Sequence, residues 1–244
     1  MPKGRTVPAA KPRDPTAPIQ TQMQLHPAIP RLAQQLADEI LDSGTSLPNV
    51  IAVVDRAATL TTDLVEQFAT EERVACRAGC SWCCNFTSVL TSAAEVLRIA
   101  AYLRAKLAPE DLQAITKRLA QRTAHISALP EERRGRARIP CALLVNQRCS
   151  IYPVRPLACM GVTSSNAAAC EASYRSGWTR PIPNGPRHLG IAVDVRTGMT
   201  ESLTHAGLDG SGLDLTIALR IALETPDIAD RWLAGEPVFA AAAL

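Results

Sequence analysis

The sequence has little of what marks several common classes of protein. Aromatic residues make up only 4% of its 244 residues, so the core has to be built mainly from Leu, Ile, Val and Ala. It has no apolar run of roughly 18 residues, which excludes a membrane-spanning helix. The net charge of +3 is too small to indicate a nucleic-acid partner, and no protein partner is indicated either. With 47% hydrophobic and 20% charged residues, the chain is expected to build a hydrophobic core rather than remain disordered.

The first 28 residues differ in composition from the rest. Seven of the 18 prolines lie between Pro2 and Pro30, among basic residues such as Lys3 and Arg5. No apolar stretch follows these charges, as it would in a secretory signal. We therefore expect residues 1–28 to be a disordered, proline-rich basic arm, and the protein to be cytoplasmic, where thiols are kept reduced.

Apolar periodicity predicts a mainly helical fold with a small β-hairpin, α+β overall. Ser92 and Glu95 form a capping box at the start of one helix, and Pro109 opens the next. The expected helices run from Pro30 to a stop at Gly44 (apolar stripe Leu32, Leu36, Ile40, Leu41), over about 48–73 (Val50, Val54, Ala57, Leu64, Phe68), over 92–103, from Pro109 to about 126, over 213–223 and over 226–233.

Three further segments are predicted with other structures. Residues 143–145 and 148–152 form two short strands around Asn146 and Gln147, and residues 189–195 form a buried strand. The arginine-rich stretch 129–140 is an exposed loop. Cys141 and Cys149 flank the hairpin and share a face of it only if the loop has an odd number of residues or a bulge.

All eight cysteines fall within one window of 95 residues, and their spacing favours metal binding. The first group reads Cys76-x3-Cys80-x2-Cys83-Cys84, and such spacing lets neighbouring thiolates converge on one ion. Disulfides, inert buried cysteines and a redox pair at Cys80 and Cys83 are the alternatives. The missing secretory signal and the crowding of four cysteines into nine residues disfavour disulfides. Clustering at ligand spacing disfavours inert cysteines, and the absence of a βαβ pattern disfavours a redox pair. The expected metal ligands are Cys76, Cys80, Cys83, Cys84, Cys141, Cys149, Cys159 and Cys170.

The second half of the window supplies the other ligands and supporting residues. Pro156 is placed to open a helical turn, near whose start a Cys159 thiolate would be stabilised. Guanidinium groups can offset the net charge of about −2 that four thiolates leave on a divalent ion. We expect Arg77, Tyr152 and Arg155 to support the site rather than perform chemistry. His125, His188 and His205 are more simply surface or core residues.

Two motifs together resemble a known family. Cys76-x3-Cys80-x2-Cys83-Cys84 and the string from Cys149 through Tyr152-Pro-Val-Arg155-Pro156 to Cys159 are similar to the CxxCxxCC family, also called the YkgJ-type cysteine cluster family. The resemblance covers roughly residues 76–170. Two departures from the pattern are the third residue between Cys76 and Cys80, and Met160 where a basic residue often follows. The resemblance implies chelation of zinc or of an iron–sulfur cluster, a four-iron cluster included.

The expected function is therefore metal binding, with zinc and an iron–sulfur cluster both open. By analogy with flagellin lysine methylase, which carries such a domain, the alternative is an iron–sulfur-dependent enzyme of methyltransferase type. Its candidate catalytic groups would be Asp194, Glu201, His205 and Asp209. The expected organisation is an arm over 1–28, a helical part over 29–75, a metal-stabilised cysteine-cluster domain over 76–170, and a strand with helices over 171–244 packing on the same core.

Overall fold

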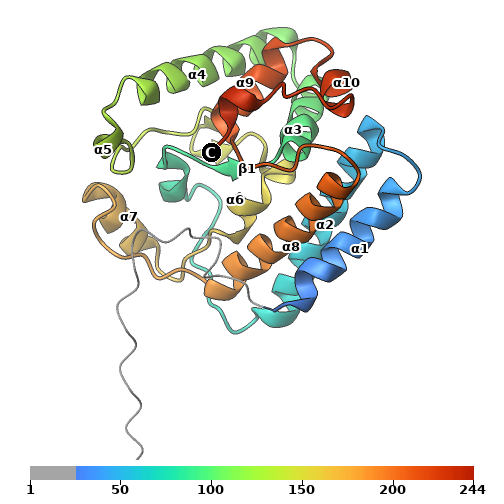
Figure 1. Ribbon diagram of the computed structural model, residues 1–244. Coiled ribbons are helices and arrows are strands. Elements are labelled where there is room, and N and C mark those ends of the chain that lie inside the picture. The colour runs from blue at the N-terminus through green and yellow to red at the C-terminus, as the bar shows by residue number, and fades with distance from the viewer. Residues whose placement is uncertain (1–25) are drawn as a thin grey trace, which may run out of the picture.

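The computed structural model describes residues 26–244, so nearly all of the expected basic arm lies outside the described residues. The described part is 61% helical, with ten α-helices and two small two-stranded antiparallel sheets (Figure 1). The mainly helical fold expected from the sequence is thus confirmed. In this part of the chain, no helix combines the length and apolarity needed to cross a membrane.

The elements follow one another along the chain with short connections. The α-helices are α1 (Ala28–Leu41), α2 (Leu47–Phe68), α3 (Ala93–Lys106), α4 (Pro109–Ser127), α5 (Glu131–Arg134), α6 (Leu157–Gly161), α7 (Ala167–Arg175), α8 (Pro186–His205), α9 (Leu215–Glu224) and α10 (Ile228–Leu233). The strands are β1 (Leu90–Thr91), β2 (Leu144–Val145), β3 (Arg148–Cys149) and β4 (Leu213–Asp214), and the 3-10 turns are η2 (Trp82–Asn85), η3 (Tyr152–Val154) and η4 (Ala240–Ala242).

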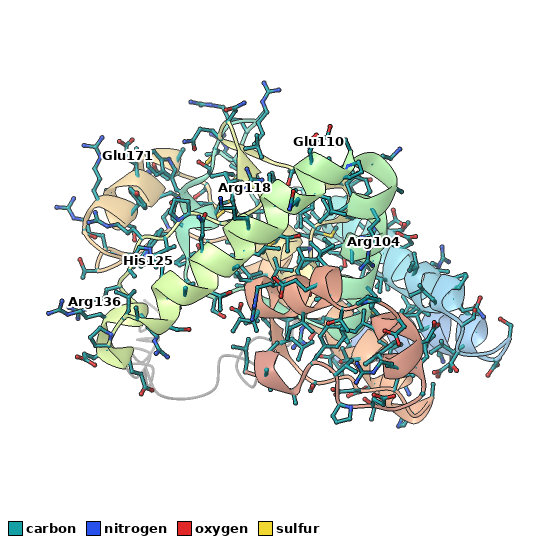
Figure 2. All side chains as sticks on the ribbon, turned by 90° about the horizontal axis from the view of Figure 1, so that it is seen from above. Arg104, Glu110, Arg118, His125, Arg136 and Glu171 are labelled. Atoms are coloured by element: carbon teal, nitrogen blue, oxygen red, sulfur yellow. The ribbon has the colours of Figure 1, made fainter. Side chains whose placement is uncertain are left out.

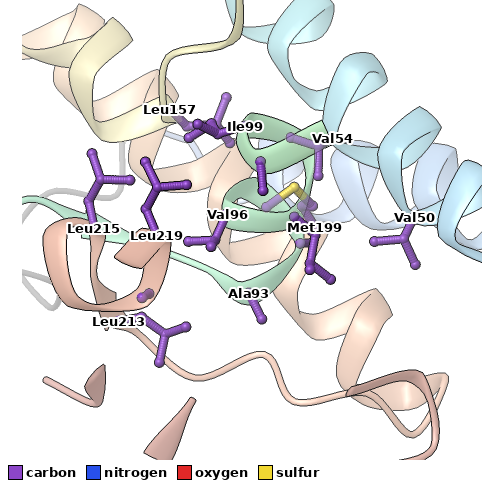
Figure 3. Packing of buried hydrophobic residues seen from close by; sticks show 14 of the residues in the cluster. Val50, Val54, Ala93, Val96, Ile99, Leu157, Met199, Leu213, Leu215 and Leu219 are labelled. Atoms are coloured by element: carbon purple, nitrogen blue, oxygen red, sulfur yellow. The ribbon is translucent and has the colours of Figure 1, made fainter. Parts of the chain in front are cut away.

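The larger helices form two groups that share one hydrophobic core. Helices α1, α2 and α8 pack together, α9 packs on α3 and α4, and α2 joins the groups through α3 (Figure 1). Figure 3 shows Val54, Ile99 and Met199, from three of these helices, meeting in the core. β1 pairs with β4 between the groups, with Leu90 opposite Asp214. This sheet was not predicted, because strands of two residues are too short to show the alternation of apolar and polar residues that indicates a strand.

The apolar stripe predicted for the first helix was only partly correct, because Leu41 is buried and Ile40 packs against the core but the main buried face is shifted. Leu32 is 40% exposed, whereas Ile29, Ala33 and Ala37 are buried. Helix α1 packs closely on α8, and small buried side chains such as Ala33 and Ala37 permit close packing of α1 against its neighbours. The stripe of α2 was predicted correctly at Val50, Val54, Ala57 and Leu64, but Phe68 at its end is 48% exposed.

The buried strand expected over 189–195 was also wrong, since these residues lie inside α8. Helix α8 is covered by α1, α2 and α6, so most of its circumference is buried. A helix buried on most sides gives a continuous apolar run without the helical period, and such a run cannot be distinguished from a buried strand. Another difference is smaller: the stretch 129–140 is mostly exposed, as expected, but it contains the single turn α5 and the buried Ile139.

A close approach of two helices depends on Gly198. A Cβ atom at this position would lie 1.9 Å from the Pro30 carbonyl oxygen of α1, a backbone atom that cannot move away alone. We expect Gly198→Ala to lower the free energy of unfolding by about 1–3 kcal/mol through overpacking. Thermal or urea unfolding measures this. In Gly135→Ala, the added Cβ meets no atom within 4 Å, so that control should change stability by at most about 0.5 kcal/mol. Equal stability of the two variants would contradict the packing described.

Candidate metal centre

The first cysteine group lies on the connection between α2 and β1. Gly79 has a φ of +85°, and the Cys80 amide donates to the Arg77 carbonyl at 2.9 Å, which closes a tight turn. η2 then carries Cys83 and Cys84. The buried Asn85 fixes this turn by donating from Nδ2 to the Ser81 carbonyl at 2.9 Å. Local hydrogen bonds therefore hold four cysteines in a short irregular segment.

A backbone pairing brings this segment against the second half of the window. The Cys141 amide donates to the Cys84 carbonyl at 2.7 Å, and the Ile139 amide donates to the Asn85 carbonyl at 3.2 Å. The two hydrogen bonds join residues more than fifty positions apart in sequence. Cys84 and Cys141 are thus neighbours because their backbones are bonded to each other.

Arg122, on α4, reinforces this pairing from behind. Its guanidinium donates to the Pro140 carbonyl at 3.0 Å, to the Phe86 carbonyl at 2.5 Å and to the Thr216 hydroxyl of α9. Figure 2 shows α4, with Arg118 and His125 labelled, running along one side of the molecule towards α7 and its Glu171. Burial lowers the pKa of Arg122, while a charge on Cys141 would raise it. Arg122 therefore positions both cysteine segments, a role that the sequence analysis missed.

The predicted hairpin is present, but its loop differs from the expectation. Leu144 lies opposite Cys149 and Val145 opposite Arg148, so the loop is the two-residue Asn146-Gln147 turn, with φ values of 49° and 61°. Common ligation by Cys141 and Cys149 was predicted to require an odd loop or a bulge, and the hairpin has neither. That condition assumed that Cys141 belongs to the strand. The ladder has only two residue pairs, and Cys141 precedes it in a turn that is closed by a hydrogen bond from the Leu144 amide to the Cys141 carbonyl, at 3.0 Å.

Cys159 is delivered by α6, and a buried carboxylate fixes the start of that helix. Glu95 Oε1 accepts from the Leu157 amide at 2.8 Å, while Oε2 accepts from the Ser92 amide at 2.8 Å. The capping box predicted at Ser92 is confirmed, and its glutamate also holds the helix that bears Cys159. Burial lowers the pKa of Arg196, and a charge on Glu95 only partly offsets this.

Five thiols from these segments form one interacting group, which we call the inner cysteines: Cys83, Cys84, Cys141, Cys149 and Cys159. The Cys84 thiol hydrogen-bonds to Cys83, which lowers the pKa of Cys83 and raises that of Cys84. Burial raises the pKa of Cys141, Cys149 and Cys159, and charges on other inner cysteines raise it further. The thiolate stabilisation expected for Cys159 at a helix start is outweighed by burial.

The other three cysteines lie beside this group. Cys76 is exposed, its sulfur 3.9 Å from the Ser164 carbonyl, and Cys170 is buried in α7. Burial raises the pKa of Cys76, and charges on Cys80, Cys83 and Cys170 would add to this. Cys83 thus interacts with both sets of cysteines.

The supporting residues that the sequence analysis selected have different surroundings. The Arg155 guanidinium lies over the Tyr152 ring, 4.3 Å from its centroid. Burial raises the pKa of Cys149 and Cys159, and the charge of Arg155 partly offsets this; for Cys83, the charge of Arg155 adds to the lowering of the pKa by the hydrogen bond from Cys84. Arg77 contributes its carbonyl to the Cys80 turn, and its side chain is exposed.

The histidines that the sequence analysis set aside have other partners or lie on the surface. His188 is paired with Glu72 at 2.8 Å, His205 contacts Gln34 at 3.0 Å, and His125 is exposed on α4.

The proposed catalytic groups of the enzyme alternative are dispersed over α8 and the loop that follows it. Asp194 is buried and accepts from the His26 amide, whereas Glu201 and His205 are exposed further along the helix. Asp209 accepts from the Ser211 amide in the following loop.

An aromatic cluster borders the cysteines and was also missed. Trp82 and Phe86 flank Cys83 and Cys84, and their rings contact Tyr174 at 5.3 Å and Trp178 at 4.4 Å respectively, measured between centroids. Four of the nine aromatic residues are therefore gathered here, which shields one side of the cysteine segment.

The donor set fits a thiophilic metal in its chemistry. None of the eight cysteines forms a disulfide, and sulfur is the ligand that zinc and iron–sulfur clusters share. Within residues 26–244, however, no three Cys, His, Asp or Glu side chains are arranged so that they could hold one ion. The backbone brings the inner cysteines together, and ligation requires their side chains to turn towards a common centre.

Comparison with known proteins agrees with this donor set. Residues 75–176, which include all eight cysteines, match the sequence model of a family described as "CxxCxxCC: Putative zinc- or iron-chelating domain". No curated protein and no solved structure matches the chain.

The role given to Arg122 makes a direct prediction. Arg122→Lys keeps the charge but cannot reach three acceptors at once, and an unsatisfied buried acceptor costs about 1–3 kcal/mol. We expect the free energy of unfolding to fall by about that amount, and bound metal to fall with it. Arg118→Lys, one turn away on α4, is the control and should retain both. Elemental analysis and urea unfolding measure the two quantities, and an unchanged Arg122→Lys protein would refute the role.

Proposed function

We propose that the protein binds zinc or an iron–sulfur cluster through its cysteines, and the match of residues 75–176 to the CxxCxxCC family model supports this. The observation that carries the proposal is the group of inner cysteines. Its five thiols come from η2, from the turn before β2, from β3 and from α6. Inert cysteines would need no such gathering from distant segments.

Ligands from both halves of the window are proposed to bind the same centre. Cys83 and Cys84 are adjacent, and neighbouring side chains are poorly placed to bind one tetrahedral ion together. Cys141, Cys149 and Cys159 lie on segments that are held together through contacts with the first half and with Glu95. Shared ligation makes metal binding a part of folding for this region.

The surroundings suit a negatively charged thiolate centre. Burial raises the pKa of several of these thiols, so they lose their protons only when a cation compensates the charge. Arg155 offsets part of the negative charge that remains after ligation. A bound zinc ion would supply structural stabilisation, and a bound iron–sulfur cluster would supply electron transfer.

An iron–sulfur-dependent enzyme is the second candidate. The observation that favours it is an open cleft beside the inner cysteines, at Arg155 and Met160. The methyltransferase chemistry implied by the family resemblance rests on analogy.

The proposal predicts that removing a ligand from either half of the cysteine window lowers metal binding by the whole protein. Cys80→Ser, from the first half, and Cys159→Ser, from the second, should each reduce the metal content of the whole protein and lower its unfolding temperature. In the double variant the losses should be less than additive, because either change already disrupts one shared centre. Metal content by elemental analysis and thermal unfolding of anaerobically purified protein are the measurements.

A control separates loss of ligation from local damage. Ala158→Ser changes the position next to Cys159 on α6, adds the same hydroxyl group and removes no thiol. It should keep its full metal content. If each single variant lost half of the metal and the double variant lost all of it, shared ligation would be contradicted. Full metal content in both single variants would contradict ligation by these two cysteines.

A further inference from the structure

A cleft of about 480 Å³ opens between α2 and the segment that joins β3 to α6. Cleft volumes of roughly 300–1,000 Å³ are usual for small-molecule sites. Its lining combines two arginines, one aspartate and two threonines with the apolar surfaces of Tyr152, Pro153 and Met160. The cleft borders the inner cysteines through Arg155, and neither the metal proposal nor the family match assigns it a ligand.

The guanidinium of Arg155, whose charge acts on the neighbouring thiols, also lines the cleft. Tyr152 holds the guanidinium from one side by stacking, at 4.3 Å from the ring centroid. Among the ion pairs of the described residues, none involves Arg155. A guanidinium carries five N–H donors in a planar fork, the geometry that binds a carboxylate or a phosphate through two hydrogen bonds.

The other charges of the cleft compensate each other. Arg98 has a side chain that is only 10% exposed, and its Nε and a terminal nitrogen lie 2.7 Å and 2.5 Å from one oxygen of Asp55. Because this pair is neutral overall, the lining retains one net positive charge, at Arg155. The cleft therefore favours an anion over a cation.

The threonines of the cleft offer hydrogen-bond acceptors to a ligand. Thr59 and Thr62 donate their hydroxyl protons to the carbonyls of Asp55 and Ala58, at 3.0 Å and 3.1 Å. A hydroxyl that already donates its proton still has lone pairs, so it accepts from a ligand. The matching ligand carries hydroxyl or amino donors as well as an acidic group.

We propose that this cleft binds a small organic anion whose carboxylate or phosphate pairs with Arg155 and whose hydroxyl groups donate to Thr59 and Thr62. The site goes beyond the proposed metal binding and does not require metal for its chemistry. Met160 and the Tyr152 ring, which line the same cleft, would lie against the apolar part of the ligand.

Four probes separate the parts of this recognition in calorimetric titrations of the full chain. Ribose 5-phosphate and gluconate combine an acidic group with hydroxyls, ribose has hydroxyls alone, and inorganic phosphate has charge alone. We expect Kd values of about 1 mM or tighter for at least one of the first two, and binding at least tenfold weaker for the last two. The difference between ribose 5-phosphate and gluconate tells whether the acidic group is a phosphate or a carboxylate.

Variants locate the binding. Arg155→Gln should weaken the better probe at least tenfold, whereas Arg148→Gln, an equal charge change at an exposed position on β3, should leave it unchanged. Thr59→Val, also exposed, should weaken that probe about two- to tenfold and leave phosphate unaffected. Metal content measured on the same samples keeps this test separate from the metal proposal. Absence of binding by both acidic sugars, or equal losses in the two arginine variants, would overturn the inference.

Discussion

The hydrogen-bonded contact between the Cys84 and Cys141 segments is the constraint on which the cysteine site depends. The amides of residues 141 and 139 donate to the carbonyls of residues 84 and 85, at 2.7 Å and 3.2 Å, in a region with little regular structure. Arg122 binds carbonyls on both sides of this contact from a position buried among α4 and α9. A guanidinium suits this role because it can donate in several directions at once without losing its charge.

A second buried charge performs the corresponding task for Cys159. Glu95 accepts from the amide of Ser92, the N-cap of its own helix, and from the Leu157 amide of α6, with Arg196 as a nearby positive charge. Both positioning residues, Arg122 and Glu95, belong to helices that contribute to the hydrophobic core, so the cysteine segments are attached directly to that core. The apolar cluster extends from α1 to η4, across the boundaries that the sequence analysis expected at residues 75 and 170. Those boundaries stay a prediction from the sequence.

The sequence predicted what depends on local chemistry. The capping box at Ser92, the helix opened by Pro109 and the turn at Asn146-Gln147 all follow from short-range rules, and the structure has each of them. The eight cysteines and the family pattern likewise needed only spacing. The failures came from long-range contacts. Helix α8 was read as a strand because helices on several sides bury it, and the face of α1 was partly misplaced because the α1 backbone at Pro30 and Gln34 packs against Gly198 of α8.

The positioning residues were beyond sequence reasoning for the same reason. Nothing in the neighbourhood of Arg122 distinguishes it from Arg118, and only the fold brings Phe86 and Pro140 to it. Glu95 was visible as a cap, but its second bond, to a residue 62 positions away, was not. Which of the eight thiols bind metal is decided at this same long-range level, so the ligand set remains a proposal.

The measurement that tests the central claim most directly is metal analysis of anaerobically purified protein, combined with X-ray absorption at the edge of the metal found. The account predicts stoichiometric zinc or iron whose nearest neighbours are sulfur atoms, at about 2.3 Å for zinc. For zinc the protein would be colourless, and for iron it would be brown. Protein whose eight cysteines are paired in disulfides and which holds no metal would contradict the account, as would a metal surrounded by nitrogen and oxygen alone.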